Sequence, residues 1–327
     1  MLFVKEIPDR LRSNLLIHPL FLLCLLLATA CSDQPPLNIG SNQWPGYEPI
    51  YLARELGLLS RQEVNLVELP SSTDVMQHLR NHNLDGGMLT LDEVLTLVAE
   101  GLPLRVILVM DISHGADAVL AQPEIKSLDG IKGKRIGVEL SGLGALMLEC
   151  LLGAANLAPE DVEIVPLTVD QHANAFIERQ VDLVITFEPT RQKLLSRHAV
   201  ELINSSLIPG RIIDVLAVRQ EVLMKGADQL KSLIDGYFSA RRYMTEQPVS
   251  AAKKMAPRLG LKHESLSQIF QGLIFPSLQE NRGWLEINSP GLIDSADQLV
   301  ERMLVHKLLP VRPDLEQLAD SRFLPEK

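Results

Sequence analysis

Two aromatic side chains stand directly after a short apolar run that predicts a strand, and both suit the binding of a small molecule. Trp44 and Tyr47 follow residues 37–42 in a loop that contains Pro45 and Gly46. Rings at such a place can stack on a flat ligand or surround a cation. The alternative is that they only pack the loop against the sheet. We interpret Trp44 and Tyr47 as candidate ligand contacts.

Carboxylates and hydroxyls at the ends of other predicted strands form a second group of candidates. The group comprises Thr90, Asp111, Ser113, Asp117, Glu188 and Asp214. The three that surround Gly115, namely Asp111, Ser113 and Asp117, could equally reach a binding site or hold a hinge. The basic side chains nearby are few, namely His114, Arg191 and Arg211. Such a set favours a ligand with an amine or several N–H donors over a bare oxyanion. Asp92 is instead the predicted N-cap of the following helix.

Ser141 and Gly142 lie between a predicted strand and a predicted helix. Free backbone N–H groups at a helix start bind anionic or carbonyl oxygens, so both residues are candidate ligand contacts. Ser141 could also be the N-cap of that helix. The stretch "GLGALM" lacks the third glycine of a dinucleotide fingerprint. Acids at one end and a helix start at the other predict a small, bifunctional ligand.

Catalytic and metal-binding alternatives have weaker support. Ser141, His114 and Asp117 could be drawn as a triad, but the chain has no G-x-S-x-G elbow. His78 and His82 are spaced i, i+4, yet no third metal ligand is evident near them. We therefore expect no catalytic residue, no metal and no cofactor, and interpret the chain as a binding protein.

Alternating strand and helix patterns must position these residues. The predicted strands are at 37–42, 64–70, 86–91, 104–112, 134–140, 162–168, 181–189, 200–206 and 211–219, with helices between most of them. This rhythm implies mostly parallel sheets covered by helices. From Ala227 onward the pattern is largely helical, with helices predicted at 227–247, 250–260, 263–274 and 291–309.

The simplest architecture is an α/β fold with two lobes and a ligand cleft between them. Lobe one is predicted to span 37–114 and lobe two 118–209, and residues 214–327 return to lobe one with the C-terminal helices. Ligands of open α/β sheets bind outside the carboxyl ends of the strands. The two crossings between the lobes would then form a hinge.

The N-terminal residues predict export. Leu20 to Ala30 is an unbroken apolar run of about half the length that a membrane-spanning helix needs. We interpret 1–30 as a signal peptide and 31–36 as a polar tether. The stretch "LATAC" resembles a bacterial lipobox, with Cys31 as the lipidated first residue of the mature chain, although Ala28 stands where leucine is usual. Ordinary secretion after an A-x-A site is the alternative. Either reading places the protein on the periplasmic or cell-surface side, held to a membrane in the first case.

Composition excludes one class of partner. The net charge is −10 with 31 basic and 41 acidic residues, and aromatic residues make up 4 % of the 327. An acidic chain without a basic block and with few rings is not equipped for nucleic acid. Cys150 lies in an apolar helix and is predicted to be a buried small hydrophobe.

Three stretches carry a family resemblance, namely "IGSNQWPGYEPIYLARELGLL", "LDGGMLTLDEVLTLVAEGLPLRVILVMDISHGADAVLA" and "IKSLDGIKGKRIGVELSG". They resemble substrate-binding proteins of bacterial ABC importers, of the nitrate, sulfonate and taurine type that also contains thiamine-precursor binders. The resemblance covers about residues 37–220. It implies a type II periplasmic-binding fold, cleft closure on a small solute, and partnership with a permease and its ATPase.

The expected function is delivery of a small polar organic molecule, sulfonate- or taurine-like or amine- or pyrimidine-like, to an ABC importer. We expect a monomer whose other partners are the ligand and a membrane. One alternative is a ligand-sensing lipoprotein coupled to a membrane signalling protein. The other is a small-molecule enzyme on the same fold.

Overall fold

The computed structural model describes residues 34–286 and 291–326. The fold below is that of the compact unit that begins at Pro36. The predicted signal peptide, the lipidation site Cys31 and the first part of the tether lie outside the described residues. Within the described part of the chain, no helix combines the length and the apolar character needed to cross a membrane.

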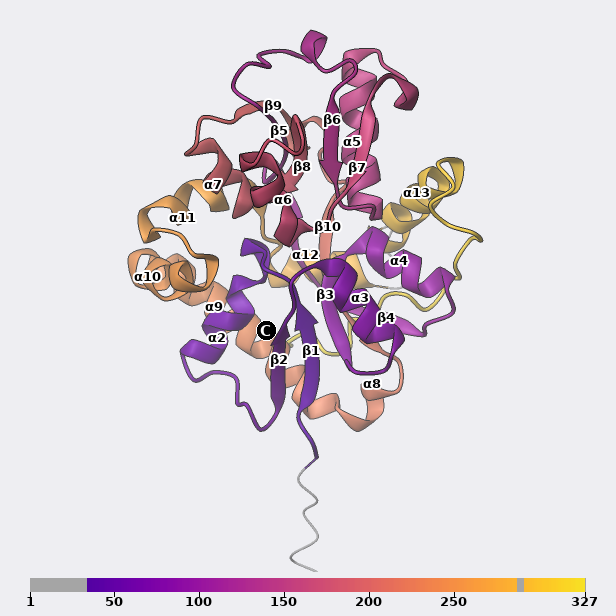
Figure 1. Ribbon diagram of the computed structural model, residues 1–327. Helices are drawn as coiled ribbons and strands as arrows, with labels where there is room; N and C mark the ends of the chain where they lie inside the picture. The colour runs from indigo at the N-terminus through magenta and orange to yellow at the C-terminus, as the bar shows by residue number, and fades with distance from the viewer. Residues whose placement is uncertain (1–33, 287–290, 327) are drawn as a thin grey trace, which may run out of the picture. The chain divides into compact units, whose positions relative to one another are not determined.

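A six-stranded sheet forms the first lobe (Figure 1). Its strands are β1 (Leu37–Ser41), β2 (Val64–Glu68), β3 (Gly86–Thr90), β4 (Leu104–Ser113), β10 (Ile213–Arg219) and β11 (Leu273–Ile274), in the order β11-β4-β10-β3-β1-β2. β1 pairs in parallel with β2 and β3, whereas β10 is antiparallel to both β3 and β4. The returning strand therefore lies in the middle of the sheet.

A five-stranded sheet forms the second lobe. It contains β5 (Asp117–Ala121), β6 (Arg135–Val138), β7 (Glu163–Pro166), β8 (Leu183–Phe187) and β9 (Val200–Asn204), in the order β7-β6-β8-β5-β9. Its helices are α5 (Gly142–Ala155), α6 (Val169–Ile177) and α7 (Thr190–Leu195), which contact β5, β6 and β8. The two-lobed α/β fold predicted from the sequence is confirmed. The exact boundaries given above for each lobe stay predictions.

The remaining helices belong with the first sheet. They are α2 (Glu48–Glu55), α3 (Ser72–Arg80), α4 (Leu91–Ala99), α8 (Val222–Lys225), α9 (Ala227–Glu246), α10 (Pro248–Leu259), α11 (Leu266–Phe270), α12 (Leu278–Leu285) and α13 (Gly291–Val305). The 3-10 turns are η2 (Pro45–Tyr47), η3 (Leu128–Gly130), η4 (Pro159–Asp161), η5 (Ser205–Leu207) and η6 (His263–Ser265). On α9, Leu230, Leu233, Ile234 and Tyr237 are buried. Their spacing gives the helix one apolar face, which packs in the same core as α2.

Two strands near the centre of the first sheet are buried along almost their whole length. β3 is buried at every position, and β4, with the sequence "LRVILVMDIS", at every position but Arg105. A strand covered on both faces needs such a continuous apolar run rather than an alternating one. The residues that follow each of these strands lie at the edge of the sheet.

Two crossings join the lobes, between β4 and β5 and between β9 and β10. The Ser205 side chain ties them together, since its Oγ lies 2.8 Å from Ser113 Oγ and accepts a hydrogen bond from the Gly115 backbone N–H at 2.7 Å. Gly115 has a φ of +117°, a conformation that side-chain-bearing residues rarely adopt. The first crossing is therefore sharp and needs glycine at this point.

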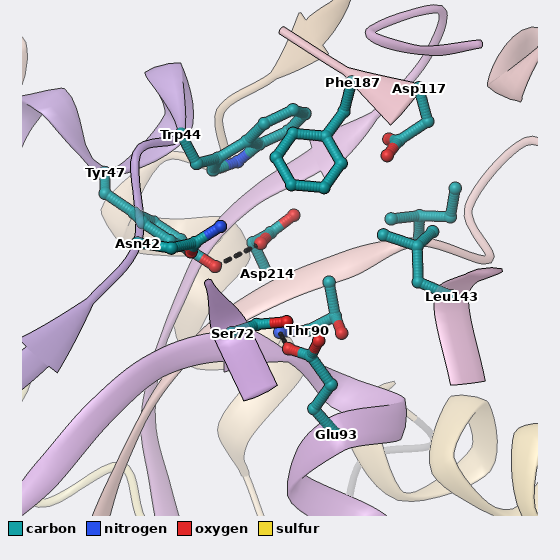
Figure 2. A pocket seen from close by; sticks show the side chains of 11 residues that line it. Asn42, Trp44, Tyr47, Ser72, Thr90, Glu93, Asp117, Leu143, Phe187 and Asp214 are labelled. Carbon is teal, nitrogen blue, oxygen red and sulfur yellow. Dashed lines mark hydrogen bonds between the residues drawn. The ribbon is translucent and has the colours of Figure 1, made fainter. Parts of the chain in front are cut away.

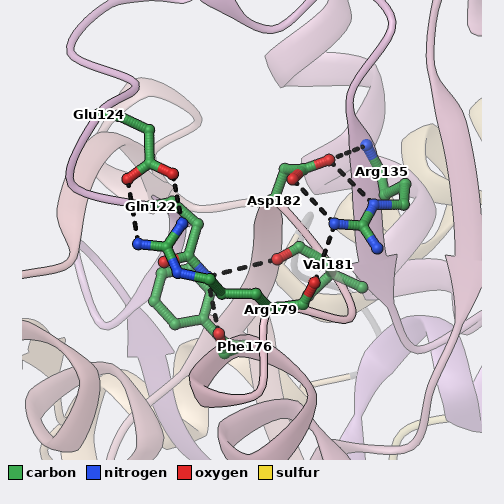
Figure 3. A network of polar contacts seen from close by, with 7 residues as sticks. All are labelled: Gln122, Glu124, Arg135, Phe176, Arg179, Val181 and Asp182. Carbon is green, nitrogen blue, oxygen red and sulfur yellow. Dashed lines mark hydrogen bonds and ion pairs between the residues drawn. The ribbon is translucent and has the colours of Figure 1, made fainter.

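An ion pair fastens neighbouring strands of the second lobe (Figure 3). Asp182, which precedes β8, accepts hydrogen bonds from the backbone N–H of Arg135 at 2.9 Å and from its guanidinium at 3.0 and 3.1 Å. Arg135 begins β6, so the pair fixes the start of both strands. The pair is of the planar, two-pronged kind, which gives it a more defined geometry than a single contact.

The same region contains a buried amide. Gln122 Nε2 donates hydrogen bonds to the carbonyl oxygens of Phe176 and Val181, which links β5 to the end of α6. Beside it, Arg179 pairs with Glu124 at 2.5 Å, but both side chains are more than half exposed. An exposed pair contributes about 0–1 kcal/mol, so the buried amide is the stronger restraint.

The prediction of mostly parallel sheets is wrong, because β5, β10 and β11 pair antiparallel with their neighbours. Two predicted segments also differ from the structure. Residues 273–274 form β11 rather than the end of a helix predicted over 263–274, because they pair with β4 at Ser113 and Ile112. The stretch 117–121 forms a complete buried strand between β8 and β9, where the sequence indicated only a crossing. Both differences arise from pairing with strands distant in sequence.

Candidate functional site

A small cavity lies between the two lobes (Figure 2). It is lined by Asn42, Trp44, Tyr47, Ser72, Thr90, Glu93, Asp117, Leu143, Phe187, Ile212 and Asp214. Asp117, Leu143 and Phe187 come from the second lobe, and most of the others from the first. We call this space the interlobe cavity.

Strand register brings the polar side chains together. In the first sheet, Asp214 on β10 is paired with Thr90 on β3 and with Asp111 on β4. In the second sheet, Asp117 on β5 is paired with Phe187 on β8. Residues far apart in sequence therefore stand side by side at the edges that face the cavity.

Two aromatic rings form one wall of the interlobe cavity, as Figure 2 shows. The rings of Trp44 and Phe187 meet edge to face, with centroids 5.4 Å apart and planes at 88°. Trp44 Nε1 donates to both carboxylate oxygens of Asp111 at 3.2 Å. The indole N–H is thus already used, and Trp44 presents its apolar ring to the cavity. The wall combines one ring from each lobe.

Asp214 and Asp117 each have one oxygen without a protein partner. The Tyr47 hydroxyl donates to Asp214 Oδ1 at 2.6 Å. Asp214 Oδ2 and Asp117 Oδ2 are buried and have no hydrogen-bond partner among the described residues. Both aspartates are 2 % exposed. A buried polar atom left unpaired costs about 1–3 kcal/mol, so a ligand that pairs with it gains at this point.

Burial raises the pKa values of the cavity acids. Desolvation raises the pKa of Asp117 to about 7, opposed by a hydrogen bond from Ser113 and reinforced by Asp92 and Glu188. Desolvation, followed by the charge of Asp111, raises the pKa of Asp214 well above its usual range. Burial raises the pKa of Glu93 to about 8, with Asp92 adding to the effect. Burial thus favours the protonated forms of these carboxyls, and an incoming cation would displace their protons.

The structure brings half of the predicted ligand contacts to the interlobe cavity. Trp44, Tyr47, Thr90, Asp117 and Asp214 line it. Ser141 lines a neighbouring cavity instead and is also the N-cap of α5, since its Oγ accepts from the Gly144 N–H at 3.3 Å. Both roles considered for Ser141 are therefore compatible.

The remaining predicted contacts have other partners. Asp111 binds Trp44, and Ser113 binds Ser205 at the crossing. Glu188 is 1 % exposed, and its carboxylate accepts from the Arg191 guanidinium at 2.9 Å and from the Gln192 N–H at 3.1 Å. A second contact joins Arg191 to Glu201 at 2.6 Å. That Asp111, Ser113, Gly142 and Glu188 touch ligand stays a prediction.

The predicted N-cap Asp92 is wrong. Helix α4 begins at Leu91 and its N-cap is Thr90, whose backbone N–H donates to Glu93 at 3.0 Å. The chain passes from the last residue of β3 directly into the helix, so Asp92 already lies in the first turn. Its carboxylate is 5 % exposed and points towards the other lobe, where it meets Gly142.

Sequence reasoning missed Asn42, Ser72, Glu93, Leu143, Phe187 and Ile212. Asn42 and Ser72 come shortly after β1 and β2, so the strand-end rule that selected Trp44 could have found them. Glu93 follows Thr90 by three residues, the spacing of a capping box. Ile212 and Leu143 carry no signal of this kind, because apolar residues are common throughout the chain.

A neighbouring cavity shares Ser72, Glu93, Asp117, Leu143 and Phe187 with the first. It is further lined by Glu139, Ser141, Gly144, Met147, His172, Ile185 and Thr186. Burial lowers the pKa of His172 to about 4, so its imidazole is neutral at physiological pH. Its Nδ1 lies 3.2 Å from Thr186 Oγ1. This second space extends the site into the second lobe.

No metal centre is formed by the residues the structure describes. Nowhere in 34–286 or 291–326 do three or more His, Cys, Asp or Glu side chains gather in a way that could hold an ion.

The fold and the interlobe site define a class, that of the periplasmic binding protein fold. The alkanesulfonate-binding protein SsuA from Xanthomonas axonopodis pv. citri, solved with bound MOPS, superposes with a TM-score of 0.71 over 86 % of this chain and 97 % of that one, at 18 % identity. The desulfurization enzyme DszB superposes with a TM-score of 0.65 over 88 % and 97 %, also at 18 % identity. The same fold thus occurs in binding proteins and in an enzyme.

A family model described as NMT1/THI5 like matches residues 44–251, which is more than half of the chain. The chain therefore belongs to the NMT1/THI5-like family. A relative from Brucella abortus (strain 2308) that is named a binding protein is 25 % identical over 235 residues, covering 69 % of this chain and 72 % of the relative. The predicted resemblance to substrate-binding proteins is confirmed at the level of fold and family.

Proposed function

We propose that the chain is an extracytoplasmic solute-binding protein that delivers a small polar organic molecule to an ABC importer. Family membership, the binding-protein name of the Brucella relative and the likeness to SsuA support this function. A cavity between two lobes joined by two crossings is the arrangement that lets such a protein close on its ligand.

One observation supports the class of ligand that we propose. Asp117 and Asp214 present buried, unpaired carboxylate oxygens to the interlobe cavity, and Glu93 adds a third acid. None of the 11 described residues that line the cavity is Lys, Arg or His. Such a cavity offers buried oxygen atoms that become charged acceptors when a cation displaces their protons, so it favours a ligand with an ammonium group or several N–H donors. A bare inorganic anion would lack any cationic partner there.

The aromatic wall and the small volume limit the ligand further. Trp44 and Phe187 offer apolar ring surface, and a ring face also attracts a cation. The space open to the centre of a water-sized sphere is about 20 Å³ in each of the two cavities, so only a small group fits between the lobes as they stand. The preferred ligand is therefore small, with one cationic or N–H-rich end.

Calorimetry with a panel of nitrate, alkanesulfonates, taurine, primary amines and aminopyrimidines tests this proposal. An amine or aminopyrimidine should bind best. Asp214→Asn removes the charge while keeping the side-chain shape. It should weaken that binding by about ten- to a hundredfold, because a hydrogen bond to a charged group is worth about 1.5–3 kcal/mol.

A matched control is Asp320→Asn. Asp320 is also a buried aspartate, 8 % exposed, but it pairs with Arg322 and does not line the cavity. Its substitution should leave the affinity unchanged. Tight nitrate or sulfonate binding that Asp214→Asn does not alter would contradict the proposed ligand class, and turnover of a bound compound would point to an enzyme instead.

Export and anchoring are a separate part of the proposal. We infer cleavage before Cys31 and lipidation of that residue, since an apolar run too short to span a membrane ends there. Intact-mass analysis of the membrane fraction should find a chain that begins at Cys31 and carries lipid. A soluble form with an unmodified Cys31 would leave only the secretion alternative.

A further inference from the structure

One carboxylate of the second lobe reaches the first turn of a helix in the first lobe. Glu139 follows β6 and is 7 % exposed. Its Oε1 accepts hydrogen bonds from Thr73 Oγ1 at 2.5 Å and from the Thr73 backbone N–H at 3.3 Å, in the first turn of α3. The backbone N–H of Val169, the first residue of α6, also lowers the pKa of Glu139, against desolvation that raises it. A single carboxylate thus serves two helix starts.

A second carboxylate makes the reciprocal contact. Asp92, in α4 of the first lobe, meets the start of α5 in the second lobe. The Leu143 backbone N–H lowers the pKa of Asp92, while desolvation raises it to about 6. Residue 142 has to be glycine here, because a Cβ on Gly142 would lie 2.3 Å from Asp92 Oδ2. The close approach is therefore built into the sequence of both helices.

In an α/β binding protein, the N-terminal ends of helices are the places that would hold an anion. Their backbone N–H groups are unpaired and the helix dipole is positive there. In this chain Glu139 occupies the start of α3, and the carboxylates of Glu139 and Asp92 lie beside the starts of α6 and α5 respectively. Glu139, Ser141 and Leu143 all line the cavity next to the interlobe cavity, so the occupied starts face the site.

We infer that Glu139 and Asp92 determine specificity by acting as built-in anions. They fill the helix starts that face the site and contribute negative charge to it. Ligands with a sulfonate, sulfate or carboxylate head group are thereby excluded. Because each carboxylate binds the opposite lobe, the same contacts that exclude an outside anion also join the two lobes.

Sulfate at low ionic strength is the probe for this inference. Glu139→Ala removes the carboxylate and frees the Thr73 hydroxyl and the N–H groups of Thr73 and Val169. Sulfate should then bind at least about tenfold more tightly than to the unsubstituted protein, since one charge-assisted hydrogen bond is worth about that factor. Calorimetry and the rise of the melting temperature with sulfate, against chloride at equal ionic strength, both measure it.

Two control variants separate occupancy from charge. Asp170→Ala removes an exposed acid from the first turn of α6, one of the two helices whose starts lie beside Glu139. It should give no gain in sulfate binding. Glu139→Gln removes the charge but keeps an acceptor in the same place, and should give little gain. No gain in Glu139→Ala, or an equal gain in Asp170→Ala, would overturn the inference.

The unsubstituted protein provides a measurement that does not depend on any variant folding. It should bind neither sulfate nor methanesulfonate at concentrations where the amine of the panel saturates. Tight methanesulfonate binding would overturn the inference. The proposed ligand class is tested separately, because it fails if no amine binds to the unsubstituted protein. Sulfate binding to Glu139→Ala still tests the inference in that case.

Discussion

Asp117 meets two opposing requirements at the scale of a single residue. Its carboxylate is buried, which favours the protonated form, and it stands at a cavity where a cation would favour the ionised form. The pKa of about 7 in the empty cavity places the balance near neutral pH. Small changes in pH should therefore change how well the site accepts a positive charge.

Binding of a primary amine should tighten as the pH rises from 6 to 8. The amine stays protonated over this range, while Asp117 passes from mostly protonated to mostly ionised. Binding of the cation to the ionised form releases up to one proton from this group, so the affinity should rise by about tenfold across the range. Calorimetry in buffers of different ionisation enthalpy measures both the affinity and the proton release.

Asp117→Asn should bind the amine more weakly and with a shallower pH dependence, because one titrating group is lost. Asp320→Asn should keep the slope of the unsubstituted protein. An affinity that stays constant or falls as the pH rises would show that the cavity acids are already ionised without ligand.

At the scale of an element, the crossing between β4 and β5 is the most constrained piece of backbone near the site. Gly115 adopts a φ of +117° and its N–H is bonded to Ser205 Oγ. No atom lies within 3.8 Å of the place that a Cβ would occupy, the nearest being Asn204 Oδ1 at 3.9 Å. The requirement for glycine is therefore conformational rather than a matter of space.

Gly115→Ala should lower the free energy of unfolding by about 1–3 kcal/mol, because alanine is strained at this backbone conformation. The matched control is Gly153→Ala, within α5 and with nothing near its Cβ position. It should raise the free energy of unfolding by about 0.5–1 kcal/mol through helix propensity. Urea denaturation measures both. Equal effects of the two substitutions would show that the crossing relaxes without strain.

At the scale of the whole molecule, the interlobe cavity is built from both lobes, so its completion depends on how they close. Trp44 meets Phe187 across the gap, and Glu139 meets Thr73. All of these contacts would be lost if the lobes swung apart at the two crossings. Ligand that touches both walls should favour the closed arrangement.

The radius of gyration of the protein should fall when the tightest-binding amine of the panel is added to saturation. Small-angle scattering measures this change. The Asp214→Asn variant at the same amine concentration should show a smaller fall, in proportion to its lower occupancy. An unchanged radius in the saturated, unsubstituted protein would indicate a rigid site and a different use of the fold.

The sequence by itself determined the two-lobed α/β fold and the family. Strand and helix differ in the period of their apolar residues, and a continuous run such as β4, bounded by Pro103 and Gly115, indicates a strand covered on both faces. The rule that polar residues after strands face the ligand also selected Trp44, Tyr47, Asp117 and Asp214, because strand ends meet at one edge. These are local signals, and local signals are readable from sequence.

Only the tertiary structure decided which of these residues are free to meet a ligand. Glu188 and Asp214 are both acids near strand ends, yet Arg191 binds the first and the second keeps an unpaired oxygen. The contact of Glu139 with Thr73 joins residues 66 positions apart. Pairing of this kind depends on register and on lobe closure. A side chain's partner is set by which distant strand or helix packs beside it, and no local pattern contains that information.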